Sequence, residues 1–197
     1  YIGVENAAIP GVVVYDVQEG TVSKKIDLLL GGGHFLAIEH RTDKLYYPMR
    51  LDDRVVVLDT ETDEILKIIP VEGGPVGVAF SPEGEAWIHS DYDGSVSVID
   101  METDEVVHVI QTEGEGAGRI DVSADGRFAA STRGGTEDVH VIDTRSREVA
   151  AVIPLGTPGS AFPLFSPESD KLYVQISYRG TPRGGEVVII DLDSMAI

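Results

Sequence analysis

Several stretches of this sequence are versions of one another. The clearest copies are RVVVLDTETDE at 54–64, SVSVIDMETDE at 95–105 and VHVIDTRSRE at 139–148, with partial copies at 11–16 and 186–191. Their shared aspartates are Asp16, Asp59, Asp100, Asp143 and Asp191, spaced by 43, 41, 43 and 48 residues. A fixed period of about 40 residues indicates a repeat architecture, in which each unit buries its faces against its neighbours.

One repeat, from Gly73 to Thr112, contains the signals of four short strands. Strands are predicted at 76–81, 85–90, 95–100 and 105–110, because apolar or alternating runs are separated by turn residues such as SPEG and DYDG. Proline and glycine fit the early and positive-φ positions of such turns. The unit is therefore a four-stranded antiparallel meander, which at this period is typical of a β-propeller blade.

The sequence predicts an all-β fold, a β-propeller with about four and a half blades and roughly eighteen strands. We label the strands of a blade A to D, from the centre of the propeller, its hub, outward. The predicted units are a partial blade B–C–D at 1–30, whole blades at 31–72, 73–113 and 114–156, and a partial blade A–B–C at 157–197. The two partial blades duplicate strands B and C when combined. We therefore expect an incomplete ring, either part of a six- to eight-bladed propeller or one completed by other chain segments.

The composition excludes several classes of protein. Fifteen basic residues stand against 34 acidic ones, a net charge of −19, which argues against nucleic-acid binding. The acidity indicates either solubility or a docking face for a basic partner. There is no cysteine, so disulfides and thiolate chemistry are excluded, and no apolar run is long enough to span a membrane. The chain begins with Tyr1, in the middle of a repeat, so the absence of a signal peptide says little about the precursor.

The repeat resembles the YVTN-type propellers. The resemblance is carried by VAFSPEG at 78–84, by the later VSVIDMET at 96–103 and by KLYVQ at 171–175, and it covers essentially the whole chain. It implies a propeller fold and a location in the periplasm or outside the cell. Propellers of this type include surface-layer proteins, binding proteins, lactonase-like enzymes and quinone-, haem- or copper-dependent oxidoreductases, so the resemblance alone does not select a function.

His34 is the first candidate for a ligand site at the hub. Alignment of the repeats places it just before strand A, at the same position as Val76, Gly118 and Ala161. His34 is therefore a polar residue where the other repeats have small or apolar ones, at the mouth of the central tunnel. An imidazole there would bind a metal or act as an acid or base, or it would simply fill the tunnel together with water.

Arg119 and Asp121 are the other hub candidates. Arg119 is aligned with Phe35, Gly77 and Phe162, and would clamp a carboxylate or phosphate or form a salt bridge. Asp121 replaces alanine on strand A. Since the two residues are two positions apart on one strand face, we expect a mutual ion pair.

The remaining polar features are expected to be structural. His89 on strand B is predicted to make a rim or inter-blade hydrogen bond, and no pair of histidines has the spacing of a local metal motif. The acidic turns after Asp59 and Asp100 lack the glycine of a calcium loop, so these aspartates are expected to accept backbone N–H groups. Trp87 is predicted to pack between blades. No nucleophile elbow, phosphate loop or dinucleotide fingerprint is present.

The last B–C loop, YRGTPRGG at 178–185, is longer than its counterparts and carries Arg179 and Arg183 in an otherwise acidic chain. A long loop on a repeat scaffold often belongs to a binding face, and the competing interpretation is a neutral insertion.

These features favour an extracytoplasmic propeller module without its own catalytic set. It would bind a small-molecule ligand or a protein partner at its hub or loop face. The alternative is part of a propeller oxidoreductase or hydrolase whose hub, including His34 and Arg119, completes a site for copper, haem or zinc. A third hypothesis is a structural surface-layer or adhesion repeat.

Overall fold

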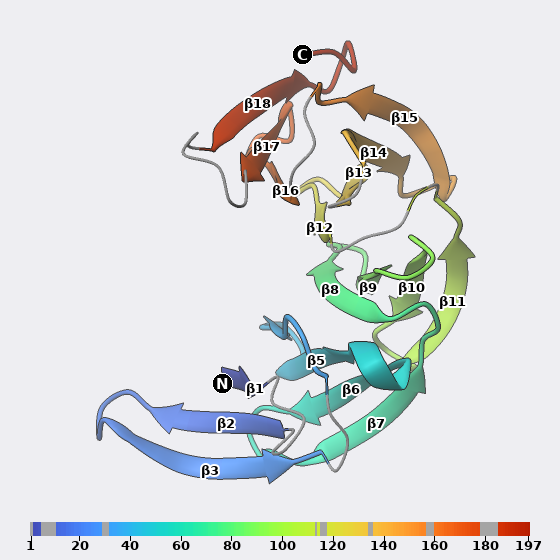
Figure 1. The fold of residues 1–197 in the computed structure, drawn as a ribbon. Coiled ribbons are helices and arrows are strands. Elements are labelled where there is room, and N and C mark those ends of the chain that lie inside the picture. Colours follow the sequence, from blue (N-terminus) through green and yellow to red (C-terminus); the bar gives the residue numbers. More distant parts are fainter. Residues whose placement is uncertain are drawn as a thin grey trace.

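The computed structural model describes residues 2–4, 11–28, 32–112, 114, 118–133, 136–156, 160–177 and 185–197. In this part of the chain, eighteen strands form five antiparallel sheets, each with its strands in sequence order. Figure 1 shows the sheets side by side along an open arc, with the first and last sheets at its two ends. The predicted all-β propeller fold with an incomplete ring is therefore confirmed.

The strands of the five sheets have the following bounds. The first sheet contains β1 (Ile2–Val4), β2 (Gly11–Asp16) and β3 (Thr21–Asp27). The second contains β4 (Ala37–Glu39), β5 (Lys44–Met49), β6 (Arg54–Asp59) and β7 (Ile65–Pro70). The third contains β8 (Pro75–Phe80), β9 (Glu85–Ser90), β10 (Val96–Asp100) and β11 (Glu105–Ile110). The fourth contains β12 (Arg119–Val122), β13 (Phe128–Thr132), β14 (Asp138–Asp143) and β15 (Glu148–Pro154). The fifth contains β16 (Ser160–Phe165), β17 (Lys171–Ser177) and β18 (Glu186–Asp191).

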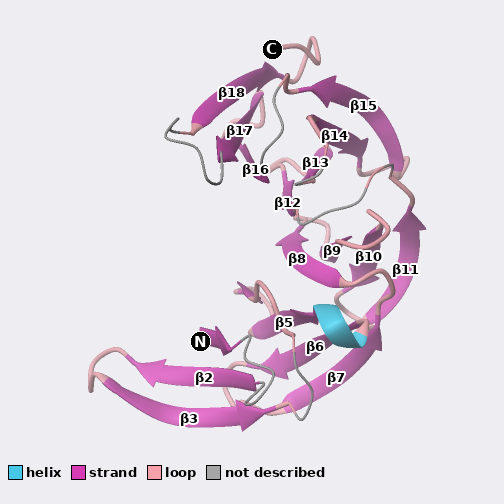
Figure 2. Cartoon of the chain, in the orientation of Figure 1, coloured by secondary structure: helices cyan, strands magenta, loops and turns pink. Residues whose placement is uncertain are grey.

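Helical structure in the described residues is limited to one 3-10 turn, Arg50–Asp52, between β5 and β6 (Figure 2). No helix in this part of the chain is long and apolar enough to cross a membrane.

Apolar side chains fill the spaces between neighbouring sheets. The four buried clusters each draw residues from two adjacent sheets, as expected when a blade cannot bury both faces alone. Trp87 on β9 is 0% exposed and packs with Val98 of its own sheet and Ile120 and Ile142 of the next one. The prediction that Trp87 lies between blades is confirmed.

The turns that begin at the repeated aspartates, which we call the C–D turns, repeat the same hydrogen bonds. In the three four-stranded sheets these turns join the third and fourth strands. Oδ1 of Asp59 accepts the N–H groups of Glu61 and Thr62, both at 2.8 Å. The equivalent aspartates accept in the same way, namely Asp16, Asp100, Asp143 and Asp191. The predicted Asx-type turns are therefore confirmed.

The inner strands β8, β12 and β16 lie on the concave side of the arc, and β3, β7, β11 and β15 lie on its convex side (Figure 1). Ahead of β4, the N–H of Phe35 donates to the carbonyl of Val76 on β8 at 3.1 Å. This bond joins the inner edges of the second and third sheets. We use the word hub for the start of the inner strands, the segments that lead into them and the adjoining ends of the second strands.

Candidate functional site: the polar hub

The site begins with the short segment before β4. The N–H of His34 donates to the carbonyl of Pro48 at the end of β5, at 3.0 Å, which fixes the backbone beside the hub. The His34 imidazole is half-buried and meets the Phe35 ring edge-on, with ring centroids 4.2 Å apart. The structure therefore places His34 at the hub, as the repeat alignment predicted.

Arg119 lies between two aromatic rings. Its guanidinium carbon is 2.9 Å from the centroid of Phe35 and 4.9 Å from that of Phe162 on β16. These residues occupy the same repeat position in the second, fourth and fifth sheets, and Gly77 occupies it in the third. Stacking of this kind holds an arginine in place while it leaves the N–H donors at the edge of the guanidinium available.

Those donors have no acceptor in the described part of the chain. Every contact of the half-buried Arg119 side chain within this part is a ring contact or a longer-range electrostatic one, and none is a hydrogen bond or an ion pair. Burial lowers the pKa of Arg119 to about 10, and the charge of Asp91 opposes this shift. The salt bridge that we considered for Arg119 is absent among the described residues.

The predicted ion pair between Arg119 and Asp121 is wrong. Oδ2 of Asp121 accepts the N–H of Phe165 on β16 at 2.8 Å, so its carboxylate joins two inner strands. Burial raises the pKa of Asp121, and this hydrogen bond partly offsets that rise. Arg119 instead lies between aromatic rings. Alternation along a strand placed the two residues on one face, but it did not show that each has a stronger partner on a neighbouring sheet.

The sequence analysis missed a third charged residue of the hub, Asp91. It follows β9, its side chain is 1% exposed, and its Oδ2 lies 3.0 Å from Nε of Arg50. Its Oδ1 accepts the N–H of Gly118, at 3.3 Å, and lies 3.8 Å from Nε2 of His89. Asp91 therefore links segments that lead from or into three sheets.

The Asp91 carboxyl also interacts electrostatically with His34 and Arg119, the residues predicted for the hub. Burial raises the pKa of the Asp91 carboxyl. Arg50, the N–H of Gly118, His34 and Arg119 each counteract that rise, in this order of size. The predicted residues His34 and Arg119 thus share one electrostatic site with Asp91 and Arg50.

A signal for this residue was present in the sequence. Alignment of the second strands makes Asp91 the equivalent of Arg50 and Arg133, so that adjacent repeats carry opposite charges at one position. This position lies two residues after His89, just beyond strand B, whereas the hub residues were predicted from positions before and on strand A.

His89 has the structural role that was predicted for it. Its ring is 0% exposed, and Nδ1 lies 3.1 Å from Oγ of Ser131 on β13. This hydrogen bond crosses from the third sheet to the fourth. Gly118 makes room for the ring, because a Cβ at that position would lie 2.9 Å from Nε2 of His89 and 1.6 Å from the carbonyl oxygen of Thr132.

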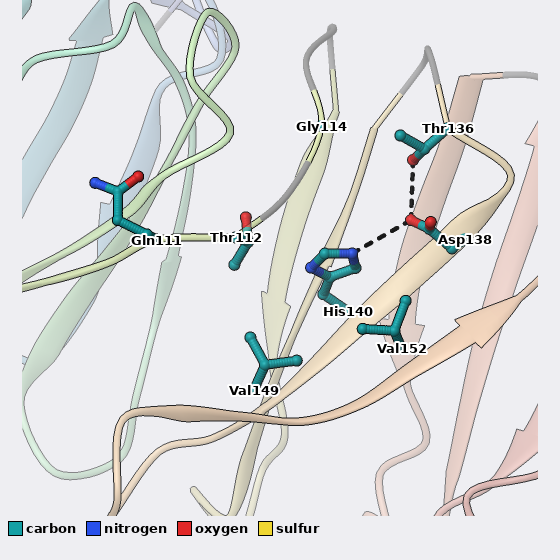
Figure 3. Close-up of a pocket in the computed structure, with 8 residues that line it drawn as sticks. All are labelled: Gln111, Thr112, Gly114, Thr136, Asp138, His140, Val149 and Val152. Carbon is teal, nitrogen blue, oxygen red and sulfur yellow. Dashed lines mark hydrogen bonds and ion pairs between the residues drawn. The ribbon is translucent and has the colours of Figure 1, made fainter.

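A separate cleft of about 480 Å³ lies between the third and fourth sheets (Figure 3). In it, Nε2 of His140 faces Oδ1 of Asp138 at 3.4 Å, and the Thr136 hydroxyl donates to the same oxygen at 2.9 Å. Nδ1 of His140 lies 3.4 Å from NH1 of the fully buried Arg133. Because arginine only donates, Nδ1 is the acceptor and Nε2 carries the hydrogen. Both ring nitrogens therefore have partners, and His140 bridges Asp138 and Arg133.

The remaining site predictions have limited structural support. The described residues contain no group of three or more metal-ligating side chains, so a metal at His34 stays a hypothesis. Arg179 and Arg183 lie outside the described residues.

The fold and the hub define a class of protein: a β-propeller whose hub holds an arginine between aromatic rings. The family model of the cytochrome D1 heme domain matches residues 15–167, which is more than half of the chain. The chain belongs to this family. The match supports the β-propeller part of the resemblance described above, whereas the YVTN-type family itself stays a prediction.

A solved structure with the same fold is that of hydrazine synthase from Kuenenia stuttgartiensis. The TM-score is 0.75 at 22% sequence identity, and the alignment covers 82% of this chain and 46% of that one. The chain thus spans less than half the length of this structural relative, and at this identity the match shows the fold alone. No protein of curated function matches the sequence.

Proposed function

We propose that this chain forms part of a haem-binding hub in a redox propeller. The observation that carries the proposal is Arg119: a half-buried cation, stacked between two phenyl rings, whose donors have no acceptor in the described residues. Membership of the cytochrome D1 heme domain family supports haem as the ligand. This is the alternative that the sequence left open.

The hub side chains fit the chemistry of a haem. A haem has a flat apolar macrocycle and carboxylate groups at its edge. Phe35, which is 42% exposed, and Phe162 offer aromatic surface for the macrocycle. Arg119 offers paired N–H donors for a carboxylate. His34 offers an imidazole, which is a common iron ligand in haem proteins.

Each hub residue would have a distinct task. Arg119 would bind and orient a carboxylate, and the phenyl rings would exclude water from the ligand face. The imidazole of His34 would be a ligand of the iron. Bound haem would supply one-electron redox chemistry, and the protein would tune its potential through the iron ligand and through burial.

The competing proposal is a hub that binds an anionic ligand without redox chemistry, as in the extracytoplasmic binding module favoured by the sequence. The same donors of Arg119 support it, and it does not require iron at His34. A location outside the cytoplasm stays a proposal that rests on the YVTN-type resemblance.

Titration of the full-length protein with haemin tests the proposal, with the Soret band as the readout. The wild type should bind, and Arg119→Met should bind about ten- to a hundredfold more weakly, as expected for loss of one charge-assisted pair. His34→Ala should change the Soret position by altering iron ligation. Arg145→Gln, at an exposed C–D turn, is the matched control and should bind like the wild type. Absence of haemin binding to the wild type would overturn the haem proposal.

A further inference from the structure

Two large apolar side chains are exposed where the second strands of neighbouring sheets end. Leu51, in the 3-10 turn after β5 (Figure 2), is 63% exposed, and Tyr92, which follows β9, is 48% exposed. They occupy equivalent positions, directly after Arg50 and Asp91, which form an ion pair. We propose that these two side chains, with the acidic residues around them, form a docking surface for a basic protein partner. The inference goes beyond the proposed function, because such a partner would bind with or without haem.

A glycine lies against each of the two apolar side chains. A Cβ at Gly74 would lie 2.6 Å from the ring of Tyr92, and a Cβ at Gly32 would overlap the side chain of Leu51. Both glycines have positive φ, and they occupy equivalent positions ahead of β8 and β4. The guanidinium carbon of Arg50 is 5.0 Å from the centroid of the Tyr92 ring. The exposed side chains are therefore held in place, which reduces the entropy that a partner loses by fixing them.

Carboxylates surround the two apolar side chains. Each apolar residue is followed by an aspartate, and the segment before Gly73 adds a glutamate. These residues form what we call the acidic rim: Asp52, Asp53, Glu72 and Asp93. The two turns contain two cations, of which Arg50 is paired with Asp91 at 3.0 Å, so only Arg54 offsets the acidic rim.

This combination indicates the chemistry of the partner. One exposed apolar residue is ordinary on a protein surface. Two at equivalent positions, each seated on a glycine, resemble instead the apolar centre of an interface, where tyrosine is enriched and a polar rim surrounds the contact. A negative rim attracts a surface rich in lysine and arginine and speeds its association. The expected partner therefore presents basic side chains around an apolar centre.

Photo-crosslinking in cells that make the full-length protein tests for this partner. p-Benzoylphenylalanine takes the place of Tyr92 in one variant. In the matched control it takes the place of Leu66 on β7, which is 49% exposed. We expect a protein adduct in the first variant only, and we expect the net charge of the cross-linked protein to be positive.

Binding of the purified cross-linked protein to the full-length chain then tests the apolar centre. Tyr92→Ser should weaken binding at least about tenfold, as expected for an aromatic residue at the centre of an interface. Tyr92→Phe keeps the ring and should bind like the wild type. Leu66→Ser removes an equally exposed apolar side chain elsewhere and should also bind like the wild type.

A second set of variants tests the acidic rim. Asp52→Asn/Asp53→Asn/Asp93→Asn should weaken binding and make the affinity depend less on salt, because the attraction between exposed charges is screened by salt. The control Glu61→Gln/Glu64→Gln/Glu102→Gln changes the net charge by the same amount at the C–D turns. It should keep the affinity and the salt dependence of the wild type.

Several results would overturn the docking surface. They are a variant at position 92 with no more protein adduct than the control, a cross-linked protein of negative net charge, and an adduct only with the hub ligand or with another part of the same chain. Equal effects of the rim variants and their control would overturn it as well. A wild type that does not bind haemin refutes the proposed function and leaves the docking surface unaffected.

Discussion

The C–D turns have the same residue at the same position of every repeat, whereas the hub has different residues at equivalent positions. In all five sheets, an aspartate at the same position accepts backbone N–H groups of its turn. At the hub, the equivalent residues of four sheets are Phe35, Gly77, Arg119 and Phe162. The repeated positions maintain the blade, whereas the positions that differ between repeats gather the groups that could recognise a ligand.

The pKa values of the carboxyl groups also differ between the C–D turns and the hub. Backbone hydrogen bonds hold the pKa of Asp59, Asp100 and Asp143 below the usual range. Burial instead raises the pKa of the hub carboxyls Asp91 and Asp121. The turns thus favour ionised carboxylates, and the hub holds charge at an energetic cost.

The largest expected effect tests the repeated scaffold. Trp87→Ala should lower the free energy of unfolding by about 3–5 kcal/mol, because it leaves a cavity between two sheets. Urea denaturation measures the loss, and Trp87→Phe should lose clearly less. An Ala variant that loses less than about 1 kcal/mol would contradict the inter-blade packing.

The second prediction tests whether the hub is built for a ligand rather than for stability. Arg119→Met should leave the free energy of unfolding unchanged or raise it by up to about 1 kcal/mol, because a half-buried cation without a hydrogen-bond acceptor stabilises little. Thermal unfolding without ligand is the measurement. A loss above about 2 kcal/mol would mean that Arg119 belongs to the scaffold.

A turn aspartate should behave differently from Arg119. Asp100→Ala should cost about 0.5–1.5 kcal/mol, because the N–H groups of Glu102 and Thr103 lose their acceptor. Asp100→Asn keeps an acceptor and should cost less. Equal losses in the two variants, measured by urea denaturation, would show that the charge, and not the turn, is what matters.

The smallest effect concerns pH. The folded-state pKa of Asp100 is lowered, so its contribution to stability is present above its unfolded pKa and is lost as pH falls through the folded value. The folded-state pKa of Asp121 is raised, so its contribution is present below the unfolded pKa and is lost as pH rises through the folded value.

Stability curves between about pH 2 and pH 7 should show these opposite signs. Relative to the wild type, Asp121→Asn should gain stability as pH rises, and Asp100→Asn should gain as pH falls, each by less than about 1 kcal/mol. The same slope for both variants would contradict the division between turns and hub.

The sequence was sufficient for the fold because the fold is repeated. Strands predicted at 85–90 and 105–110 are found at those residues, since every repeat presents the same alternation and the same turn signals. The C–D turns and the position of Trp87 followed from the same regularity.

The hub could be predicted only in part, because its contacts join different repeats. Alignment identified His34 and Arg119 as polar residues at positions where the other repeats have small or apolar ones. It could not show that Phe35 and Phe162 enclose Arg119, or that Asp121 bonds to Phe165, because sequence spacing does not specify contacts between sheets. Asp91 did carry a signal, because its charge is opposite to that of the equivalent residue Arg50, but alignment does not show that these two residues, 41 positions apart, are in contact.

The ion pair between Arg50 and Asp91 also makes two neighbouring blades different from each other. Arg50 belongs to the second sheet and Asp91 to the third, at equivalent positions. If one of these repeats were duplicated in place of the other, two aspartates or two arginines would meet at these positions, and like charges would repel. The blades have the same backbone fold, but they cannot replace one another. Engineered propellers assembled from them would have to keep these two repeats next to each other.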